Sequence, residues 1–240
     1  MADEEELARL LRSVIDWNSW RRTNWSVSVN LSGADLRHPS LSGADLHEAD
    51  LRRARLTRAI LDGANLTAAN LKGASAELVN LEGADLDGAH LVEADLNNAN
   101  LKRAHFRNAD LCGALLCSAR LDGTNFVETD LSGANLSRAM LVEAVFANAN
   151  LKDAVGLEAC DHRGPSVIDH RTLAKSWPLP EIFLRGCGLP ENLITYLPSL
   201  VSDGAIQFFS CFISYSHEDK SFARRLHDTL QLGHLNTRSQ

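Results

Sequence analysis

The sequence predicts a solenoid, a chain wound into successive short coils, rather than a fold of long helices or strands. A large apolar residue recurs at every fifth position from 31 to 151; of these 25 positions, 21 are Leu, three are Phe and one is Ala76. Two residues before each position lies a small residue, which is Ala at 20 of the 25 positions. A period of five fits neither an amphipathic helix nor a strand, whose apolar residues are three to four or two apart. Each unit is therefore expected to form one side of a coil, with two side chains inside and three outside.

The outward positions carry residue types that accept tight turns. Asp or Asn often precedes the large apolar residue, as at Asp35 and Asn65, and Gly often lies two residues after it, as at Gly33 and Gly63. These residues tolerate the backbone conformations of corners. We therefore expect Leu at the centre of each coil, and Ala beside it where the backbone turns.

Units such as 34–38 (Ala-Asp-Leu-Arg-His) and 134–138 (Ala-Asn-Leu-Ser-Arg) resemble the pentapeptide-repeat proteins. The resemblance covers about half of the chain. It implies a mainly β fold, a right-handed quadrilateral β-helix with four units per coil. Phe106, Phe126 and Phe146 are 20 residues apart, which supports four units per coil and predicts one column of stacked rings. With coils roughly 4.8 Å apart, the rod would be on the order of 30 Å long.

The first 28 residues predict a helical cap for the open end of this solenoid. The helix would begin with Asp3 as its N-cap and run to Trp20. One face at helical spacing carries Leu7, Leu10, Leu11, Val14, Ile15 and Asn18. The end of a solenoid exposes apolar side chains and unpaired backbone groups. The aromatic residues expected to seal it are Trp17, Trp20 and Trp25.

Residues 156–204 break the repeat and predict a Pro-rich helical connector. Ser166 and Asp169 have the spacing of a capping box before a short helix through Leu173. The ranges 180–185 and 190–197 predict two further short helices. The segment is rich in apolar residues, so we expect it to pack on the rod. The expected dock is an outward apolar patch, with a partner protein as the alternative occupant: Val127, Met140, Val142 and Val145.

Residues 206–216 predict a buried strand that ends in a polar loop, and residues 219–232 predict a helix. The run 212–216 (Phe-Ile-Ser-Tyr-Ser) resembles the first box of Toll/interleukin-1 receptor (TIR) domains. The resemblance implies an incomplete α/β strand-helix unit, in which Ser214, Tyr215 and Ser216 are remnants of the first loop. The glutamate with which enzymatic TIR domains cleave NAD is absent, so we expect no NAD hydrolysis by this chain. A longer product that completes the domain would be an NAD-hydrolysing effector.

These patterns divide the chain into a helical cap (1–28), the β-helix (29–155), the connector (156–204) and the truncated TIR-like segment (205–240). An unpaired strand at 206–214 would tend to pair with another chain, so we expect it to dock on the β-helix, to form a homodimer or to stay poorly ordered, with other TIR domains as further partners. The segments 162–165 (His-Arg-Gly-Pro) and 183–186 (Phe-Leu-Arg-Gly) also resemble the connector of bacterial proteins that join pentapeptide repeats to TIR domains. Five scattered Cys and no secretion signal favour reduced thiols and a cytoplasmic protein.

Motifs for enzymatic chemistry are sparse. The sequence has no G-x-S-x-G elbow and no P-loop. Candidate zinc ligands lack a recognised spacing: Cys160, His162, His170 and Cys187. The histidines His47, His90 and His105 are expected to be isolated on the surface. We therefore expect no catalytic residue, no metal, no cofactor and no membrane contact, and we do not expect an enzyme.

Two function classes remain. The first is a protein-protein interaction scaffold in intracellular signal transduction, with the β-helix as its binding platform. The second, implied by the pentapeptide resemblance, is a DNA mimic that binds a topoisomerase such as gyrase and needs an acidic stripe. Between residues 29 and 155, 17 acidic and 12 basic residues are interspersed along the sequence. The first coils are locally basic, with Arg expected on different sides, at Arg37, Arg52, Arg53, Arg55 and Arg58. We therefore favour the scaffold, expect no nucleic-acid partner, and expect no inhibition of gyrase supercoiling at micromolar protein.

Overall fold

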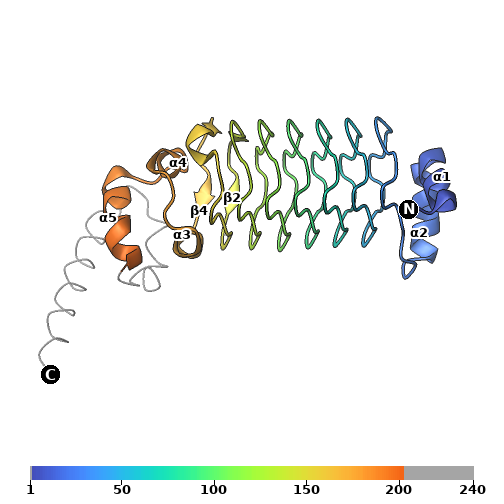
Figure 1. The fold of residues 1–240 in the computed structure, drawn as a ribbon, viewed down its shortest axis with the longest axis horizontal. Coiled ribbons are helices and arrows are strands. Elements are labelled where there is room, and N and C mark those ends of the chain that lie inside the picture. Colours follow the sequence, from blue (N-terminus) through green and yellow to red (C-terminus); the bar gives the residue numbers. More distant parts are fainter. Residues whose placement is uncertain (1, 203–240) are drawn as a thin grey trace, which may run out of the picture.

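A computed structural model of the chain describes residues 2–202, which form a rod with helices at both ends (Figure 1). Helices α1 (Glu4–Arg12) and α2 (Val14–Thr23) lie at one end. Helices α3 (His170–Ser176), α4 (Glu181–Gly186) and α5 (Glu191–Ser202) lie at the other. The predicted TIR-like unit at 205–240, including Ser214, Tyr215 and Ser216, lies outside the described residues.

Parallel bridges between residues 20 apart confirm four units per coil. They join Asn30 to Asp50, Asp35 to Arg55, Ser40 to Ile60 and Asp45 to Asn65, one on each side of the rod, and the register continues to Asn135 and Val155. Within residues 2–202, strands longer than a single bridge residue are two residues long and occur as two parallel pairs. They are β1 (Met140–Leu141) with β3 (Asp161–His162), and β2 (Val145–Phe146) with β4 (Val167–Ile168).

A unit of five with Asp or Asn before its core residue can satisfy all its backbone amides, as the unit at 71–75 shows. The amides of Leu71 and Gly73 donate to the next coil, to His90 O (2.7 Å) and Val92 O (2.9 Å). The Ala74 amide closes a turn onto Leu71 O (2.9 Å), and the Ser75 amide donates to Ala54 O of the preceding coil (2.9 Å). The remaining amide, of Lys72, has no backbone acceptor and donates to the Asn70 side-chain oxygen (3.1 Å). Asp and Asn before the core residue are therefore acceptors for this amide.

Two units that lack this Asp or Asn use an acceptor from the preceding coil. His105 and Leu115 occupy the position, and neither side chain has a carboxyl or amide oxygen that could accept a hydrogen bond. The Arg107 amide instead donates to Asp87 Oδ1 (2.8 Å). The Cys117 amide donates to Asn97 Oδ1 (2.9 Å). The requirement for an acceptor is thus met from a residue 20 positions earlier.

The residue two after each core position adopts a left-handed backbone in all 25 units, with φ between 53° and 71°. Gly occupies nine of these positions and other residues occupy 16, among them His38 (φ 69°) and Arg53 (φ 56°). The prediction that Gly marks the corners is therefore confirmed where Gly is present, but the corner itself forms in every unit. The hydrogen bonds around each turn hold non-glycine residues in a conformation that is otherwise uncommon for them.

The interior is filled by the predicted core residues. Leu and Phe at the repeat positions are at most 1% exposed. Phe106, Phe126 and Phe146 form the predicted column, with ring centroids 5.4 and 5.3 Å apart. Thr124 and Thr129 replace Ala on either side of Phe126, and their buried hydroxyls donate to Leu101 O and Phe106 O of the preceding coil (2.8 and 2.6 Å).

The N-terminal segment forms two helices where the sequence predicted one. Asp3 is the N-cap of α1 as predicted, since its carboxylate accepts hydrogen bonds from the Glu5 and Glu6 amides (both 3.0 Å). The helix ends at Ser13, whose backbone is extended and whose hydroxyl accepts from the Asp16 amide to cap α2. Ser favours caps over helix interiors because its hydroxyl competes for backbone groups.

The first coil is covered by α2, where the expectation for Trp17 and Asn18 is confirmed. Trp17 is fully buried, and its indole Nε1 donates to Asp45 O (2.8 Å). The Asn18 side chain donates to Gly43 O and accepts from the Asp45 amide, both at 2.8 Å. The expectation for Ile15 and Trp25 is wrong, because they are 79% and 70% exposed.

At the C-terminal end, side chains of α3 satisfy the edge of the last coil. Asp169 Oδ1 accepts from the Asn148 amide (2.9 Å), and the hydroxyls of Thr172 and Ser176 accept from the Ala149 and Leu151 amides (3.0 and 2.8 Å). Burial opposes the charged form of Asp169, yet hydrogen bonds from the Asn148 and Thr172 amides and from Arg171 lower its pKa overall.

The predicted capping box of the connector is wrong, whereas the predicted packing of the connector on the rod is confirmed at Met140, Val142 and Val145. Asp169, not Ser166, caps α3, and the helix extends to Ser176. The connector meets these residues by continuing the coil, since β3 and β4 pair with Met140 and Val145. Phe183 of α4 then closes the Phe column, 6.0 Å from Phe146. Unpaired backbone groups at the end of the rod cost more free energy than a partly exposed apolar patch on its side, so the connector pairs with them.

Replacement of Asn70 by Ala is expected to lower the free energy of unfolding by about 1 kcal/mol, because the Lys72 amide loses its acceptor. Urea unfolding measures the loss, and hydrogen exchange should show faster exchange at the Lys72 amide. Asn70→Asp keeps an oxygen at that place and is the control. Equal effects of Ala and Asp would contradict the role of this side chain.

Replacement of Thr172 by Val is expected to destabilise the C-terminal end by about 1–3 kcal/mol, because the Ala149 amide and Phe146 O lose a buried partner. Thr172→Ser keeps the hydroxyl and should retain most of the stability. Chemical unfolding and exchange at the Ala149 amide report the difference. The capping role is wrong if Ser destabilises as much as Val.

Candidate functional site

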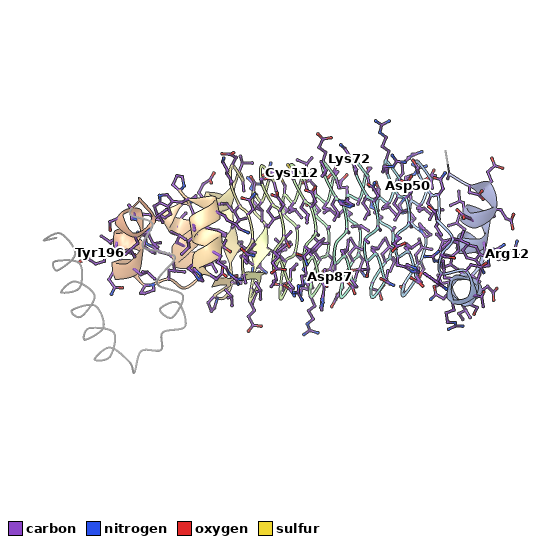
Figure 2. The ribbon with its side chains drawn as sticks, turned by 90° about the horizontal axis from the view of Figure 1, so that it is seen from below. Arg12, Asp50, Lys72, Asp87, Cys112 and Tyr196 are labelled. Carbon is purple, nitrogen blue, oxygen red and sulfur yellow. The ribbon has the colours of Figure 1, made fainter. Side chains whose placement is uncertain are left out.

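In the first three coils, the basic residues and most acidic residues lie on opposite halves of the perimeter of the rod. One half of the perimeter consists of residues 29–38, 49–58 and 69–78, and we call it the basic side. It carries every Lys and Arg of residues 29–88, with three acidic residues between them: Arg37, Arg52, Arg53, Arg55, Arg58 and Lys72. In Figure 2, Asp50 and Lys72 lie along one edge of the rod and Asp87 lies on the opposite edge.

The other half of the perimeter, residues 39–48, 59–68 and 79–88, is here called the acidic side. It carries six acidic residues and no Lys or Arg: Asp45, Glu48, Asp62, Glu82, Asp85 and Asp87. The five Arg residues lie on two adjacent sides of the four-sided coil, and the sequence did not predict that these six acidic residues gather on the other two. Charges that alternate along the sequence are sorted in space because residues 20 apart share a column.

The polarity reverses farther along the rod. On the face that carries Arg52, Arg53 and Lys72, the following coils present Glu93, Asp110 and Asp130. On the acidic side, the following coils carry basic residues, namely Lys102, Arg103, Arg107 and Arg120. Each charged side is thus about three coils long.

Ion pairs orient some of the basic side chains. Arg52 donates two hydrogen bonds to the Asp50 carboxylate (2.8 and 2.6 Å), and these lower the pKa of Asp50. The equivalent bonds from Arg37 (2.7 and 2.6 Å) lower the pKa of Asp35 to about 2. Within the described part of the chain, Arg53 and Lys72 form no ion pair. Their charges are therefore open to a ligand.

A hollow of about 460 Å³ lies on the basic side. Its lining comes from four successive coils and carries three cationic side chains and one carboxylate: Ser32, Arg52, Arg53, Lys72, Gly73 and Glu93. Sequence reasoning identified Arg52 and Arg53 but not Lys72 or Gly73. The 20-residue period, read column by column, is the signal that would have found them.

The other candidate residues of the sequence are structural. Across residues 2–202, no group of three or more His, Cys, Asp or Glu is placed to hold a metal. Cys160 and Cys187 are largely buried, and burial raises the pKa of each thiol to about 12. His162 packs edge-on against Phe183, with ring centroids 5.3 Å apart. None of the helices in residues 2–202 has the length and apolar character needed to cross a membrane.

His47 differs from the isolated surface residue that we expected. Its Nδ1 lies 2.7 Å from Asp45 Oδ1, and its ring contacts the guanidinium of the buried Arg21 (3.0 and 2.9 Å). Arg21 also donates to His47 O and Val27 O (2.9 and 3.0 Å). This cluster joins α2 to the first coil and is explained by that structural role.

Comparison with known proteins agrees with the coil geometry. The family model described as pentapeptide repeats matches stretches that together span residues 30–155. The structure of full-length QnrB1, a plasmid-mediated fluoroquinolone resistance protein, is similar with a TM-score of 0.53 and 19% identity, over 60% of this chain and 75% of that chain. At this identity, the likeness shows the fold alone. No curated protein matches the chain.

Two further structures share the repeat. A pentapeptide repeat protein from the thylakoid lumen of Arabidopsis thaliana is 34% identical, with a TM-score of 0.29, over 46% of this chain and 70% of that chain. HetL from the cyanobacterium Nostoc, involved in heterocyst differentiation regulation, is 24% identical, with a TM-score of 0.24, over 63% and 96%. These low TM-scores carry no argument about function.

The packing of His162 predicts acid sensitivity of the C-terminal end. Burial lowers the pKa of His162, partly offset by Asp161 and the Gly186 backbone. Below about pH 6.5 the unfolded chain binds a proton that the folded chain does not, so stability falls as pH decreases from there toward the folded pKa. Unfolding at pH 7.5 and 5.5 measures this. His162→Gln should flatten the dependence, whereas His170→Gln should keep it; equal slopes in both variants would exclude His162 as the cause.

Proposed function

This chain belongs to the pentapeptide-repeat family, whose members fold as right-handed quadrilateral β-helices, and we propose that it is a protein-binding scaffold. The observation that carries the proposal is the separation of charge on its outer surface. Six basic residues lie on one half of the first three coils, and six acidic residues lie on the other half. Complementary charge steers protein partners and selects among them.

The backbone of the rod supports this role. Equivalent positions of successive coils lie in register. The units that carry the outward side chains are joined by backbone hydrogen bonds between coils. Outward side chains are therefore presented from a preorganised surface, which lowers the entropy lost on binding. The interior is filled by side chains of Leu, Phe and Ala. The proposal assigns no catalytic step and no cofactor, and it places the protein in the cytoplasm.

A signalling role through TIR contacts stays a prediction from the sequence. It depends on residues 205–240, which lie outside the described part of the chain, and the family model matches residues within 30–155. The scaffold proposal does not depend on that segment.

A DNA mimic is the second candidate, favoured by the acidic side. Its six carboxylates lie on three coils, which span about 10 Å. A duplex carries one charge per about 1.7 Å of its axis, so this side matches the charge of only about three base pairs. Lys102 and Arg103 interrupt it in the next coil. The scaffold is therefore preferred, and inhibition of gyrase supercoiling at micromolar protein would favour the mimic instead.

Site-specific photo-crosslinking in cells tests the scaffold. A photoreactive amino acid replaces Lys72 on the basic side or Glu48 on the acidic side, with Arg12 on α1 as the control position. All three residues are exposed. A partner crosslinked from a side position, and bound again by the purified chain, is the expected result. Crosslinks from Arg12 alone, or none from any position, would contradict the proposal.

A further inference from the structure

We propose that the hollow on the basic side binds a short acidic segment of a protein partner, through Arg52, Arg53 and Lys72. This inference rests on the proposed scaffold function and assigns it a site. The hollow is about 460 Å³ in volume, and its lining carries three cations and one carboxylate, Glu93. A carboxylate ligand would therefore meet a net positive site on a protein whose formal net charge is −7.

The three cations are prepared differently for such a ligand. Arg52 is oriented by two hydrogen bonds to Asp50, so its remaining donors are presented in one geometry. Arg53 and Lys72 form no ion pair within the described residues. A ligand carboxylate can therefore form ion pairs with Arg53 and Lys72 without breaking an existing ion pair.

Glycine keeps the space beside Arg53 open. A Cβ at Gly73 would lie 3.8 Å from Arg53 Cγ, so a longer side chain there would occupy the hollow. Gly33, one coil before Arg53 in the same column, has no heavy atom within 4 Å of an added Cβ. Arg53 therefore lies between two positions without side chains, and a ligand can approach along its length.

The size of the basic side favours an acidic peptide over a nucleic acid. Its cations lie on three coils, about 10 Å in all, which equals about three residues of extended peptide. On the same half of the perimeter, Glu93, Asp110 and Asp130 then reverse the charge, and Glu93 lies in the column of Arg53. A nucleic acid continues past this limit with uniform negative charge and would meet those carboxylates. An acidic peptide segment can end, or continue with basic residues, where the surface of the rod changes from basic to acidic.

Binding of a labelled peptide tests the site. The probe is a fluorescein-labelled octapeptide in which Glu alternates with Ser, and fluorescence polarisation measures its affinity at low and physiological ionic strength. We expect the double variant Arg53→Glu, Lys72→Glu to bind the peptide about tenfold more weakly, a change of about 1.4 kcal/mol. Glu is compatible with the left-handed backbone at position 53, since Glu93 already adopts it (φ 57°).

The matched control is Arg103→Glu, Lys152→Glu, which changes the net charge equally. Arg103 occupies the same place in its unit as Arg53 (φ 54° and 56°), and Lys152 follows a core Leu as Lys72 does. The control should bind the peptide with less than about a twofold change in affinity, roughly 0.4 kcal/mol. Circular dichroism and thermal unfolding of both double variants verify that they fold as the parent does.

Several outcomes would overturn the site. These are equal weakening by the two double variants, absence of binding to the parent chain, and tighter binding of a single-stranded oligonucleotide of the same length. Complete competition by inorganic phosphate at equal concentration would assign the hollow to a small anion. If a partner crosslinked from the rod binds the Arg53→Glu, Lys72→Glu variant as tightly as the parent, the scaffold stands and this site is wrong.

Discussion

The backbone hydrogen bonds between successive coils are the constraint on which the rest of the rod depends. Four of the five amides find carbonyls in the same or adjacent coils, and the fifth does not. In most units an Asp or Asn before the core residue accepts from this amide, and in two units Asp87 and Asn97 of the preceding coil accept instead. Because unpaired backbone groups are costly, the pairing of backbone groups between coils permits a coil only four short sides around.

The same accounting explains both ends of the molecule. A coil without a following coil leaves amides and carbonyls unpaired, and helices from outside the repeat satisfy them with side chains. Asn18 and Trp17 do so at the first coil, and Asp169, Thr172 and Ser176 do so at the last. Apolar contacts accompany these bonds, as with Phe183 against Phe146. The ends are thus closed mainly by matching hydrogen bonds rather than by covering an apolar patch.

Function depends on a consequence of this geometry. Since residues 20 apart share a column, the coil sorts outward side chains independently of their order along the chain. Arg52 and Lys72 become neighbours in space, while Asp62, between them in sequence, lies on the acidic side. The result is a narrow rod with two short charged sides, whose unpaired cations Arg53 and Lys72 border a hollow.

The sequence by itself determined the repeat and its core, because a strict five-residue period marks every buried Leu of the repeat. The four-unit coil was implied by the resemblance to pentapeptide-repeat proteins and supported by the spacing of Phe106, Phe126 and Phe146. The sequence also identified Asp3 as a helix cap, since capping is local. It did not predict the break at Ser13, the role of Asp169, or the exposure of Trp25, because these depend on which groups the ends of the rod present. Nor did it show the basic and acidic sides. Only the tertiary structure decided these, because neighbours across coils are set by hydrogen-bond register and not by proximity along the chain.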